Sequence, residues 1–288
     1  MRPHPAVEAV ATQEAPACAG SAHAQAEEYR GHIGHVEFYD LLSAIQFNLL
    51  TALGLREGHS LLDIGCGSLR AGRLFIPYLA AGNYFGIEPL PWLVKEGIDK
   101  EIGASMVGLK RPTFRHDEDF SLGAFGRQFD FILAQSIFSH TSQAQIRRCM
   151  SEAKKVLMPG GLLVATYFEA SMDYQGSRWV AKANYTRARM CELVEEQGLE
   201  FTPIEWRHPD PQQWFVVHHP GTEVPLAIPS DPSRIRMLEE QLATQREQLL
   251  RITSHPYVRL GQKLQPFLIW MNFTRRRIVR AVRGTLGR

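Results

Sequence analysis

The sequence predicts an α/β protein built on a doubly wound, mostly parallel sheet. Apolar runs that resemble strands alternate with segments of helical periodicity from about residue 60 to residue 198, and a glycine-rich turn follows the first run. A final pair of strand-like runs has no helix between its members, so these two runs should form an antiparallel hairpin. Together these observations predict a seven-stranded sheet that ends in a C-terminal hairpin.

Seven apolar runs are expected to form the strands. They lie at residues 60–64, 83–88, 114–116, 129–134, 162–168, 201–206 and 214–218. Five segments with helical periodicity are expected to form helices. They lie at residues 36–54, 69–79, 91–102, 146–157 and 184–198. Gly54 and Gly198 stand at the ends of two of these helices, where glycine favours a C-cap.

Composition divides the 288 residues into five segments. Residues 1–28 are rich in Ala, Glu, Gln and Pro and are expected to be a disordered arm. Residues 29–219 should form the folded domain, and residues 220–232 hold four prolines and should be a linker. Residues 233–254 show fewer than three heptads, which fits either a short coiled-coil-like helix that self-associates or an ordinary surface helix. Residues 255–288 form a basic amphipathic tail that should be helical.

Charge is unevenly distributed along the chain. Residues 231–288 hold 12 Lys/Arg and 4 Asp/Glu, whereas the first 230 residues hold 20 Lys/Arg and 26 Asp/Glu. An acidic body indicates no nucleic-acid partner, and a basic tail favours an anionic one. This partner could be an anionic membrane surface, touched peripherally by residues 255–288, or an acidic protein surface.

The compartment is expected to be cytoplasmic. No apolar run approaches the ~20 residues that span a bilayer, and the N-terminus lacks the apolar core of a secretory signal. Four cysteines, at positions 18, 66, 149 and 191, have spacings that fit no zinc site, so reduced thiols are expected. No resident metal is expected.

The turn after the first predicted strand carries the strongest functional signal. Asp63, Gly65 and Gly67 form an acid-x-Gly-x-Gly pattern at the start of a predicted helix. Glycine lets the backbone approach a ligand, and a helix N-terminus offers free N–H groups. A dinucleotide-binding turn would require G-x-G-x-x-G, but Arg70 stands where the third glycine belongs. Glu88 ends the next predicted strand, where an acid can hold both hydroxyls of a ribose.

This pattern resembles motif I of the class I S-adenosylmethionine-dependent methyltransferases, whose fold is Rossmann-like. That family also ends its second strand in an acid, as Glu88 does here, and the resemblance covers residues 36–219. The resemblance implies that S-adenosylmethionine is the cofactor and that Asp63, Gly65, Cys66 and Gly67 surround its methionine part. Glu88 would then hold its ribose.

The resemblance also implies roles for residues after the next two strands. Asp119 would lie near the adenine amine, with Phe120 against the ring, and Gln135 and Ser136 would line the cofactor. The acids at positions 117–119 could in principle bind Mg²⁺, but neighbours in sequence rarely converge on one ion without a dedicated loop.

His140 is the candidate catalytic residue. It follows the fourth predicted strand, and imidazole is the side chain most often used as a general base, so it could remove the proton of an acceptor hydroxyl. The alternative is that His140 only caps the helix that begins nearby. The acceptor is expected to be a small molecule or glycan, and Arg70 could meet either the cofactor carboxylate or an anionic substrate.

Two other classes of protein compete with this interpretation. A non-catalytic scaffold could retain the domain while the tail carries the function, although a scaffold has no need of the glycine turn and Glu88. An NAD-dependent enzyme is disfavoured by the glycine spacing. Weaker candidate residues are Tyr29, His32 and His35, as parts of a lid, together with Tyr167, Glu169 and His208.

Overall fold

The computed structural model describes residues 28–225 and 243–247, and the chain divides into two units, Met1–Pro229 and Ser230–Arg288. The expected basic tail therefore lies outside the described residues, as does the expected N-terminal arm (residues 1–28) except for Glu28, which is helical. Of the expected helix at 233–254, only residues 243–247 are described, and they are helical. In the described parts of the chain, no helix is long and apolar enough to cross a membrane.

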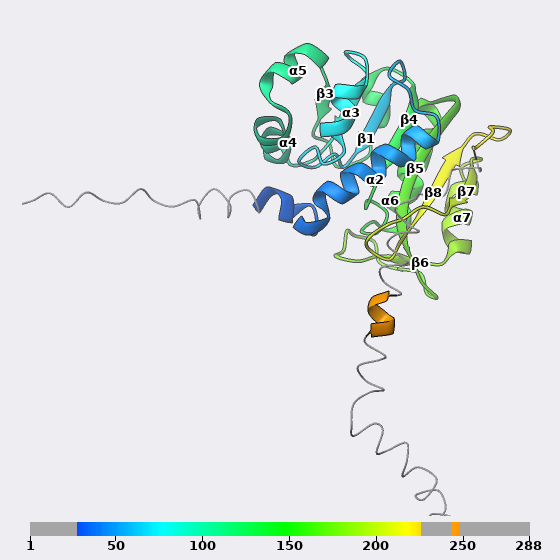
Figure 1. Cartoon of the computed structure of the whole chain (residues 1–288). Helices are drawn as coiled ribbons and strands as arrows, with labels where there is room; N and C mark the ends of the chain where they lie inside the picture. The colour runs from blue at the N-terminus through cyan, green and yellow to red at the C-terminus, as the bar shows by residue number, and fades with distance from the viewer. Residues whose placement is uncertain (1–27, 226–242, 248–288) are drawn as a thin grey trace, which may run out of the picture. The chain divides into compact units, whose positions relative to one another are not determined.

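One sheet organises the first unit (Figure 1). Its strands are β1 (Leu61–Ile64), β2 (Tyr84–Ile87), β3 (Thr113–Arg115), β4 (Phe129–Ala134), β5 (Leu157–Glu169), β6 (Asn184–Tyr185), β7 (Glu200–Ile204) and β8 (Gln212–His218). The strand order is β3-β2-β1-β4-β5-β8-β7, with the short β6 paired to β5. Strands β1 to β6 pair in parallel, whereas β8 pairs antiparallel to both β5 and β7. The predicted doubly wound sheet with a C-terminal hairpin is confirmed, but the sheet has eight strands rather than seven, because Asn184–Tyr185 pairs with β5 as β6.

Helices cover both faces of this sheet. They are η1 (Val36–Phe38), α2 (Tyr39–Ala52), α3 (Gly72–Tyr78), α4 (Pro91–Gly97), η2 (Ile98–Ile102), α5 (Ala104–Lys110), η3 (Leu122–Phe125), α6 (Gln143–Val156) and α7 (Arg187–Glu195). Residues of α2, α3 and α4 share one buried cluster with the sheet, and residues of α6 and α7 share another. The sheet is therefore the middle of three layers, with α2 crossing in front of it in Figure 1.

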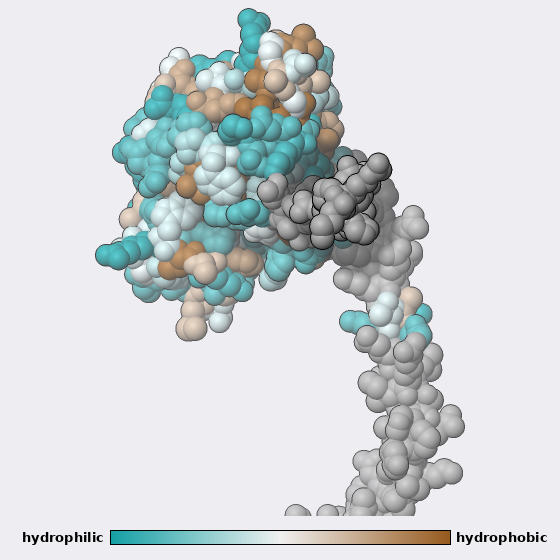
Figure 2. Space-filling view, turned by 90° about the vertical axis from the view of Figure 1, so that its left-hand side faces the viewer, coloured by the Kyte–Doolittle hydropathy of each residue, from teal (hydrophilic) through white to brown (hydrophobic). Residues whose placement is uncertain are grey.

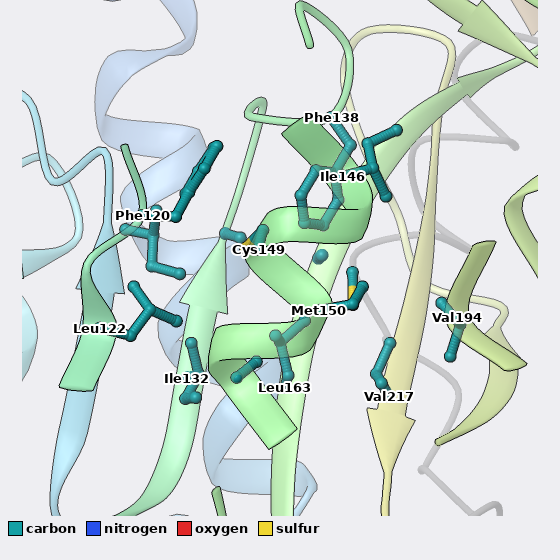
Figure 3. Packing of buried hydrophobic residues seen from close by; sticks show 14 of the residues in the cluster. Phe120, Leu122, Ile132, Phe138, Ile146, Cys149, Met150, Leu163, Val194 and Val217 are labelled. Atoms are coloured by element: carbon teal, nitrogen blue, oxygen red, sulfur yellow. The ribbon is translucent and has the colours of Figure 1, made fainter. Parts of the chain in front are cut away.

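Successive side chains of a strand point to opposite faces of the sheet and so pack in different buried clusters. Leu62 of β1 lies in the cluster beneath α6 and α7, whereas Leu61 lies in the cluster on the opposite face. Figure 3 shows Met150 of α6 among strand residues that include Leu163 and Val217, all fully buried. On the face shown in Figure 2, hydrophilic residues predominate and apolar ones form scattered patches. Burial on both sheet faces explains why the strands are nearly continuous apolar runs.

Three expected element boundaries were wrong for local backbone reasons. Helix α3 begins at Gly72 rather than at residue 69, because Leu69 adopts a left-handed φ of 61° that interrupts a helix. Strand β5 begins at Leu157 rather than at residue 162, so Pro159, Gly160 and Gly161 belong to the strand. Its pairing with β4 changes register between Phe129 and Phe131. Helix α7 begins at Arg187, because Asn184–Tyr185 pairs with β5 as β6.

The region after β2 also departs from expectation. The expected helix 91–102 is α4 followed by the π-helical η2, and α5 was not predicted at all. None of the side chains of α5 is buried. Without a buried face, this helix leaves no apolar periodicity for a sequence to reveal.

Candidate functional site

A cavity of about 760 Å³ opens at the carboxyl ends of the central strands. From β1, the strands β2 and β3 are added on one side of the sheet, and β4 and β5 are added on the other side. The cavity lies at this change of direction. Its volume falls in the range of small-molecule sites, roughly 300–1,000 Å³. The predicted residues that line it from β1 and β2 are Asp63, Gly65, Cys66, Gly67 and Glu88. Those from the next two strands are Phe120, Gln135, Ser136 and His140.

The glycine turn requires glycine for both conformation and space. Gly65 and Gly67 have φ values of 69° and 54°, in the left-handed region. A Cβ on Gly65 would overlap Ile137 Cδ1, and a Cβ on Gly67 would lie 3.0 Å from Ile33 Cγ2. The turn therefore carries its bare backbone directly along the cavity wall.

Glu88 braces this turn from the end of β2. One of its carboxylate oxygens accepts a hydrogen bond from the Gly67 N–H at 3.1 Å, and the other accepts one from the Leu90 N–H at 3.0 Å. Burial raises the pKa of this carboxyl, and the two backbone donors oppose that rise. A carboxylate with both oxygens oriented this way presents its remaining lone pairs to the cavity.

Asp63 lies deeper, at the base of the same turn. Burial raises its pKa to about 7, and the hydrogen bond that it accepts from the Tyr84 hydroxyl at 2.7 Å opposes this rise. The carboxyl therefore sits near its midpoint at neutral pH, and a cation bound beside it would favour the ionised form. Cys66 beside it is a buried thiol whose pKa burial raises, so it is not a nucleophile.

The expected position of Asp119 requires correction. Asp119 does not line the cavity; its carboxylate is exposed and accepts a hydrogen bond from the Ser121 hydroxyl at 2.6 Å. Asp117 and Glu118 line the cavity instead. Phe120 has a left-handed φ of 57°, so the chain turns here and Asp119 is directed to solvent while its neighbours face inward.

Asp117 has one carboxylate oxygen that no hydrogen bond satisfies within the described residues. Arg115 Nε donates to Asp117 Oδ2 at 2.9 Å, whereas the buried Oδ1 has no hydrogen-bond partner among the described residues. A buried acceptor without a donor is costly unless something fills the space beside it. Phe120 and Trp179 both line the cavity, and their rings stack with centroids 6.4 Å apart and an interplanar angle of 20°.

Polar side chains after β4 form a connected network. Arg70 donates to Gln135 Oε1, and Gln135 Nε2 donates to Ser136 Oγ at 2.6 Å and lies 3.0 Å from His208 Nε2. Gln212 Nε2 also donates to Ser136 Oγ, at 2.8 Å. His208 is not part of the lining, and burial lowers its pKa to about 4, so it stays neutral at pH 7. The network joins the glycine turn to the β7–β8 hairpin.

His140 has a defined tautomer. Its Nδ1 lies 3.1 Å from the Val180 carbonyl, which can only accept, so the proton is on Nδ1 and the other ring nitrogen, Nε2, is the basic one. Within the part of the chain that the structure describes, Nε2 has no hydrogen-bond partner, and the ring lines the cavity. The Val180 N–H donates back to the His140 carbonyl at 2.9 Å, which fixes the loop.

Two segments that cover the cavity were only partly anticipated. Of the three lid candidates, His32 and His35 line the cavity as part of the N-terminal strap (residues 28–35), whereas Tyr29 points away and donates to Glu101 at 2.7 Å. The β5–β6 loop (residues 170–183) contributes Trp179 and Lys182, which no sequence signal marked.

The remaining weak candidates lie elsewhere. Tyr167 and Glu169 lie within the last residues of strand β5 rather than after it, and they do not line the cavity; Tyr167 is buried in the core. In the described residues no group of three or more His, Cys, Asp or Glu side chains could hold a metal ion. The acids at positions 117–119 therefore do not converge on one point.

Residues 62–163 match the family model described as a methyltransferase domain. A structure of magnesium protoporphyrin IX methyltransferase from Synechocystis PCC 6803 with bound SAH is 14% identical, with 69% of this chain and 94% of that chain covered and a TM-score of 0.51. The glycopeptide N-methyltransferase MtfA complexed with S-adenosylmethionine is 12% identical, with 62% and 94% covered and a TM-score of 0.48. At such identities, a structural likeness shows the fold alone.

Proposed function

We propose that this chain, whose residues 62–163 match a methyltransferase-domain family model, transfers a methyl group from S-adenosylmethionine to a hydroxyl of a small molecule or glycan. One observation carries the proposal: the glycine turn, Glu88 and His140 converge on a single cavity. The solved neighbours are complexes with this cofactor or its product, which supports the same ligand here.

The residues present fit this cofactor. The free Oδ1 of Asp117 suits the adenine amine, and the oriented carboxylate of Glu88 suits the ribose hydroxyls. Asp63 suits a cationic ammonium group, which would favour its ionised form. When bound, the cofactor supplies a methyl group already activated on a sulfonium.

The chain then has two tasks, alignment and proton removal. The walls from Gly65 to Gly67 and from Gln135 to His140 hold the two reactants at fixed positions, which is a proximity effect. His140 is oriented by the Val180 carbonyl so that its unprotonated Nε2 is available to take a hydroxyl proton. The cavity beside it is lined by Gln212, Asp210 and Lys182, which offer donors and acceptors suited to a polar acceptor.

Calorimetry tests the cofactor assignment. The protein should bind S-adenosylmethionine and S-adenosylhomocysteine but not NAD. Glu88→Ala should remove two charge-assisted hydrogen bonds, each worth about 1.5–3 kcal/mol before water compensates, and so weaken binding by roughly 100-fold or more. Glu57→Ala, at an exposed site that precedes β1 and lies outside the cavity, is the matched control.

A non-catalytic scaffold is the competing interpretation. An incubation with labelled S-adenosylmethionine and acceptor fractions separates the two, with mass spectrometry of any product to distinguish an O-methyl ether from an N-methyl group. Cofactor binding without transfer to any fraction would favour the scaffold, whereas absence of cofactor binding would contradict the methyltransferase assignment itself.

We also propose that the basic tail (residues 255–288) attaches the enzyme to an anionic membrane surface. From Arg251 to Arg288 there are nine Lys/Arg and no acid, and each basic residue near an anionic leaflet contributes about 1 kcal/mol, screened by salt. The full chain should co-sediment with phosphatidylserine vesicles at low salt and dissociate at high salt. A chain that ends at Pro229 should not co-sediment with these vesicles. Equal sedimentation of the full chain and the shortened chain would contradict membrane attachment and leave docking on a protein as the alternative.

Residues 233–254 are proposed to support self-association through their short heptad pattern. Analytical ultracentrifugation of the full chain should then show a larger species than the chain that ends at Pro229. Monomers of both chains would contradict this proposal and favour an ordinary helix.

A further inference from the structure

His140 is oriented by the backbone of a loop rather than by a side chain. Its Nδ1 lies 3.1 Å from the Val180 carbonyl oxygen, and the Val180 N–H donates to the His140 carbonyl at 2.9 Å. Three residues further along the β5–β6 loop, the Ala183 N–H donates to the Ser139 carbonyl at 2.7 Å. A backbone carbonyl can orient an imidazole only as precisely as its own loop is held in place. The contacts that hold this loop therefore decide how well His140 is oriented.

The helix that follows His140 is capped by other residues. Ser142 is the N-cap of α6; its hydroxyl accepts a hydrogen bond from the Gln145 N–H, and the Gln145 side chain accepts one from the Ser142 N–H. The capping box is complete without an imidazole, and Nδ1 of His140 is directed to Val180 instead. The position of this ring is therefore set by the β5–β6 loop and not by the start of α6.

An aromatic pair anchors the part of the loop that precedes Val180. Residues 175–179 are exposed, and Trp179 stacks its ring on Phe120, with centroids 6.4 Å apart and an interplanar angle of 20°. Trp179 is 47% exposed, whereas Phe120 is 6% exposed and belongs to the buried core, so the loop rests on a fixed ring. Such stacked pairs are stabilising beyond the area that they bury. The Tyr174 hydroxyl also donates to the Arg178 carbonyl at 3.1 Å, but this bond lies within the loop.

Trp179 and Val180 are neighbours in the chain, yet they contact segments that lie on opposite sides of the centre of the sheet. Phe120 follows β3 and His140 follows β4, and β2 and β1 lie between these two strands. On the other side of Val180, Lys182 places its Nζ 4.4 Å from the ring centroid of Phe168, near the end of β5. The segment of residues 179–182 therefore crosses the carboxyl ends of the sheet, where Trp179, Ala181 and Lys182 line the cavity.

We propose that Trp179 is a positioning residue for proton removal. Its stack on Phe120 holds the Val180 carbonyl in place, and that carbonyl keeps the proton of His140 on Nδ1. The basic Nε2 then faces the cavity, as proton removal requires. The proposal rests on the proposed function, because it presumes that His140 is the base. It gives a half-exposed tryptophan a role that requires no contact with either reactant.

Loss of the stack should change the tautomer of His140. Imidazole in water favours the form with its proton on Nε2, whereas a hydrogen bond to one ring nitrogen sets which nitrogen is protonated. The Nδ1–H form is favoured here because the Val180 carbonyl accepts that proton. If the carbonyl moves away, the Nε2–H form returns. That form presents a donor to the cavity instead of an acceptor, so it cannot take a hydroxyl proton.

Histidine ¹⁵N NMR of the full chain measures this tautomer without an acceptor, at about pH 9, where imidazoles of ordinary pKa are neutral. The His140 signal is assigned by its absence from His140→Ala, and wild type should show mainly the Nδ1–H form. Trp179→Ala should lower the ratio of Nδ1–H to Nε2–H by roughly 3- to 10-fold, the effect of losing one ordinary hydrogen bond. Trp179→Phe keeps a ring on Phe120 and should return the ratio to within about 2-fold of wild type.

Trp92 offers a matched control. It is 41% exposed, its ring centroid lies 5.2 Å from that of His32, and it does not line the cavity. Trp92→Ala should change the signals of His32 and leave the tautomer ratio of His140 at the wild-type value. Thermal unfolding of both alanine variants is measured alongside, and Trp179→Phe separates loss of the ring from a general loss of structure.

The failures of the two proposals are distinguishable. An unchanged tautomer ratio in Trp179→Ala, an equal change in Trp92→Ala, or a wild-type His140 that is mainly Nε2–H would overturn the role of Trp179 while the cofactor assignment stands. If calorimetry shows that the wild-type chain does not bind S-adenosylhomocysteine, the proposed function itself is overturned, whatever the tautomer of His140.

Discussion

The two halves of the cavity are built differently. The proposed cofactor half consists of short segments that directly follow β1, β2 and β3. Its carboxylates are held by fixed donors: backbone N–H groups for Glu88, the Tyr84 hydroxyl for Asp63 and Arg115 for Asp117. The proposed acceptor half gathers side chains from three segments far apart in the chain: the loop with His140, the β5–β6 loop with Lys182, and the β7–β8 hairpin with Gln212.

This difference separates binding from selectivity. Groups fixed by the turns of a sheet have little freedom, so the cofactor half should tolerate few substitutions. Side chains carried by loops are free to differ without disturbing the fold, so the acceptor half can define which substrate is methylated. Substitutions in the proposed cofactor half should therefore change cofactor affinity, whereas substitutions in the proposed acceptor half should change turnover.

The largest effect is expected at His140, in the acceptor half. His140→Ala should lower turnover by roughly 10²–10⁴, the usual worth of a general base, because Nε2 no longer accepts the hydroxyl proton. Cofactor affinity, measured by calorimetry, should stay at the wild-type value. His59→Ala, which precedes β1 outside the cavity, should leave turnover unchanged; unchanged turnover in His140→Ala would remove this residue from the mechanism.

A smaller effect, on affinity alone, is expected from the acids after β3. Asp117→Ala should weaken S-adenosylhomocysteine binding by roughly 10-fold, because the free Oδ1 loses its proposed ligand partner. Asp119→Ala should bind like wild type, since this carboxylate faces solvent. If calorimetry gave the reverse order, the assignment of Asp117 would be wrong.

The glycine turn should respond through stability. Gly65→Ala forces a left-handed conformation that costs about 1–2 kcal/mol and adds an overlap with Ile137, so thermal unfolding should occur at lower temperature. Gly58→Ala is the matched substitution, with no heavy atom within 4 Å of the added Cβ, and should unfold like wild type. Equal melting temperatures for the two variants would show that the turn changes its backbone conformation to accept the added Cβ without loss of stability.

The smallest effect concerns the pH dependence of Asp63. Its folded pKa of about 7 lies above its ordinary value of 3.8, so the protonated carboxyl contributes stability below pH 4 that is lost as pH rises through 7. Tyr84, Arg70, Glu88 and Cys66 are the titratable groups that influence it.

Asp63→Asn should therefore flatten part of the fall in stability between about pH 4 and 7, measured by denaturant titration. Wild type should also bind S-adenosylhomocysteine more tightly as pH rises through 7, because the ionised carboxyl attracts the ammonium group, and the variant should not. A variant with the same pH profile as wild type would assign the titration to another group.

Sequence alone determined the order of strands and helices and the parts of the proposed cofactor half that follow β1 and β2. The alternation of strands and helices, the glycine spacing and the acid at Glu88 are local features, because each depends on backbone geometry within a few residues. The same local rule placed Gln135, Ser136 and His140 at the cavity, since all three directly follow a strand whose carboxyl end faces the site.

Only the tertiary structure decided which groups meet. It directed Asp117 rather than Asp119 into the cavity through the left-handed turn at Phe120, and it brought Lys182 across from the β5–β6 loop. It also joined Arg70 to Gln135, which are 65 residues apart. Such contacts depend on which strands are neighbours and how each loop bends, and neither property is encoded in the local pattern of apolar and polar residues.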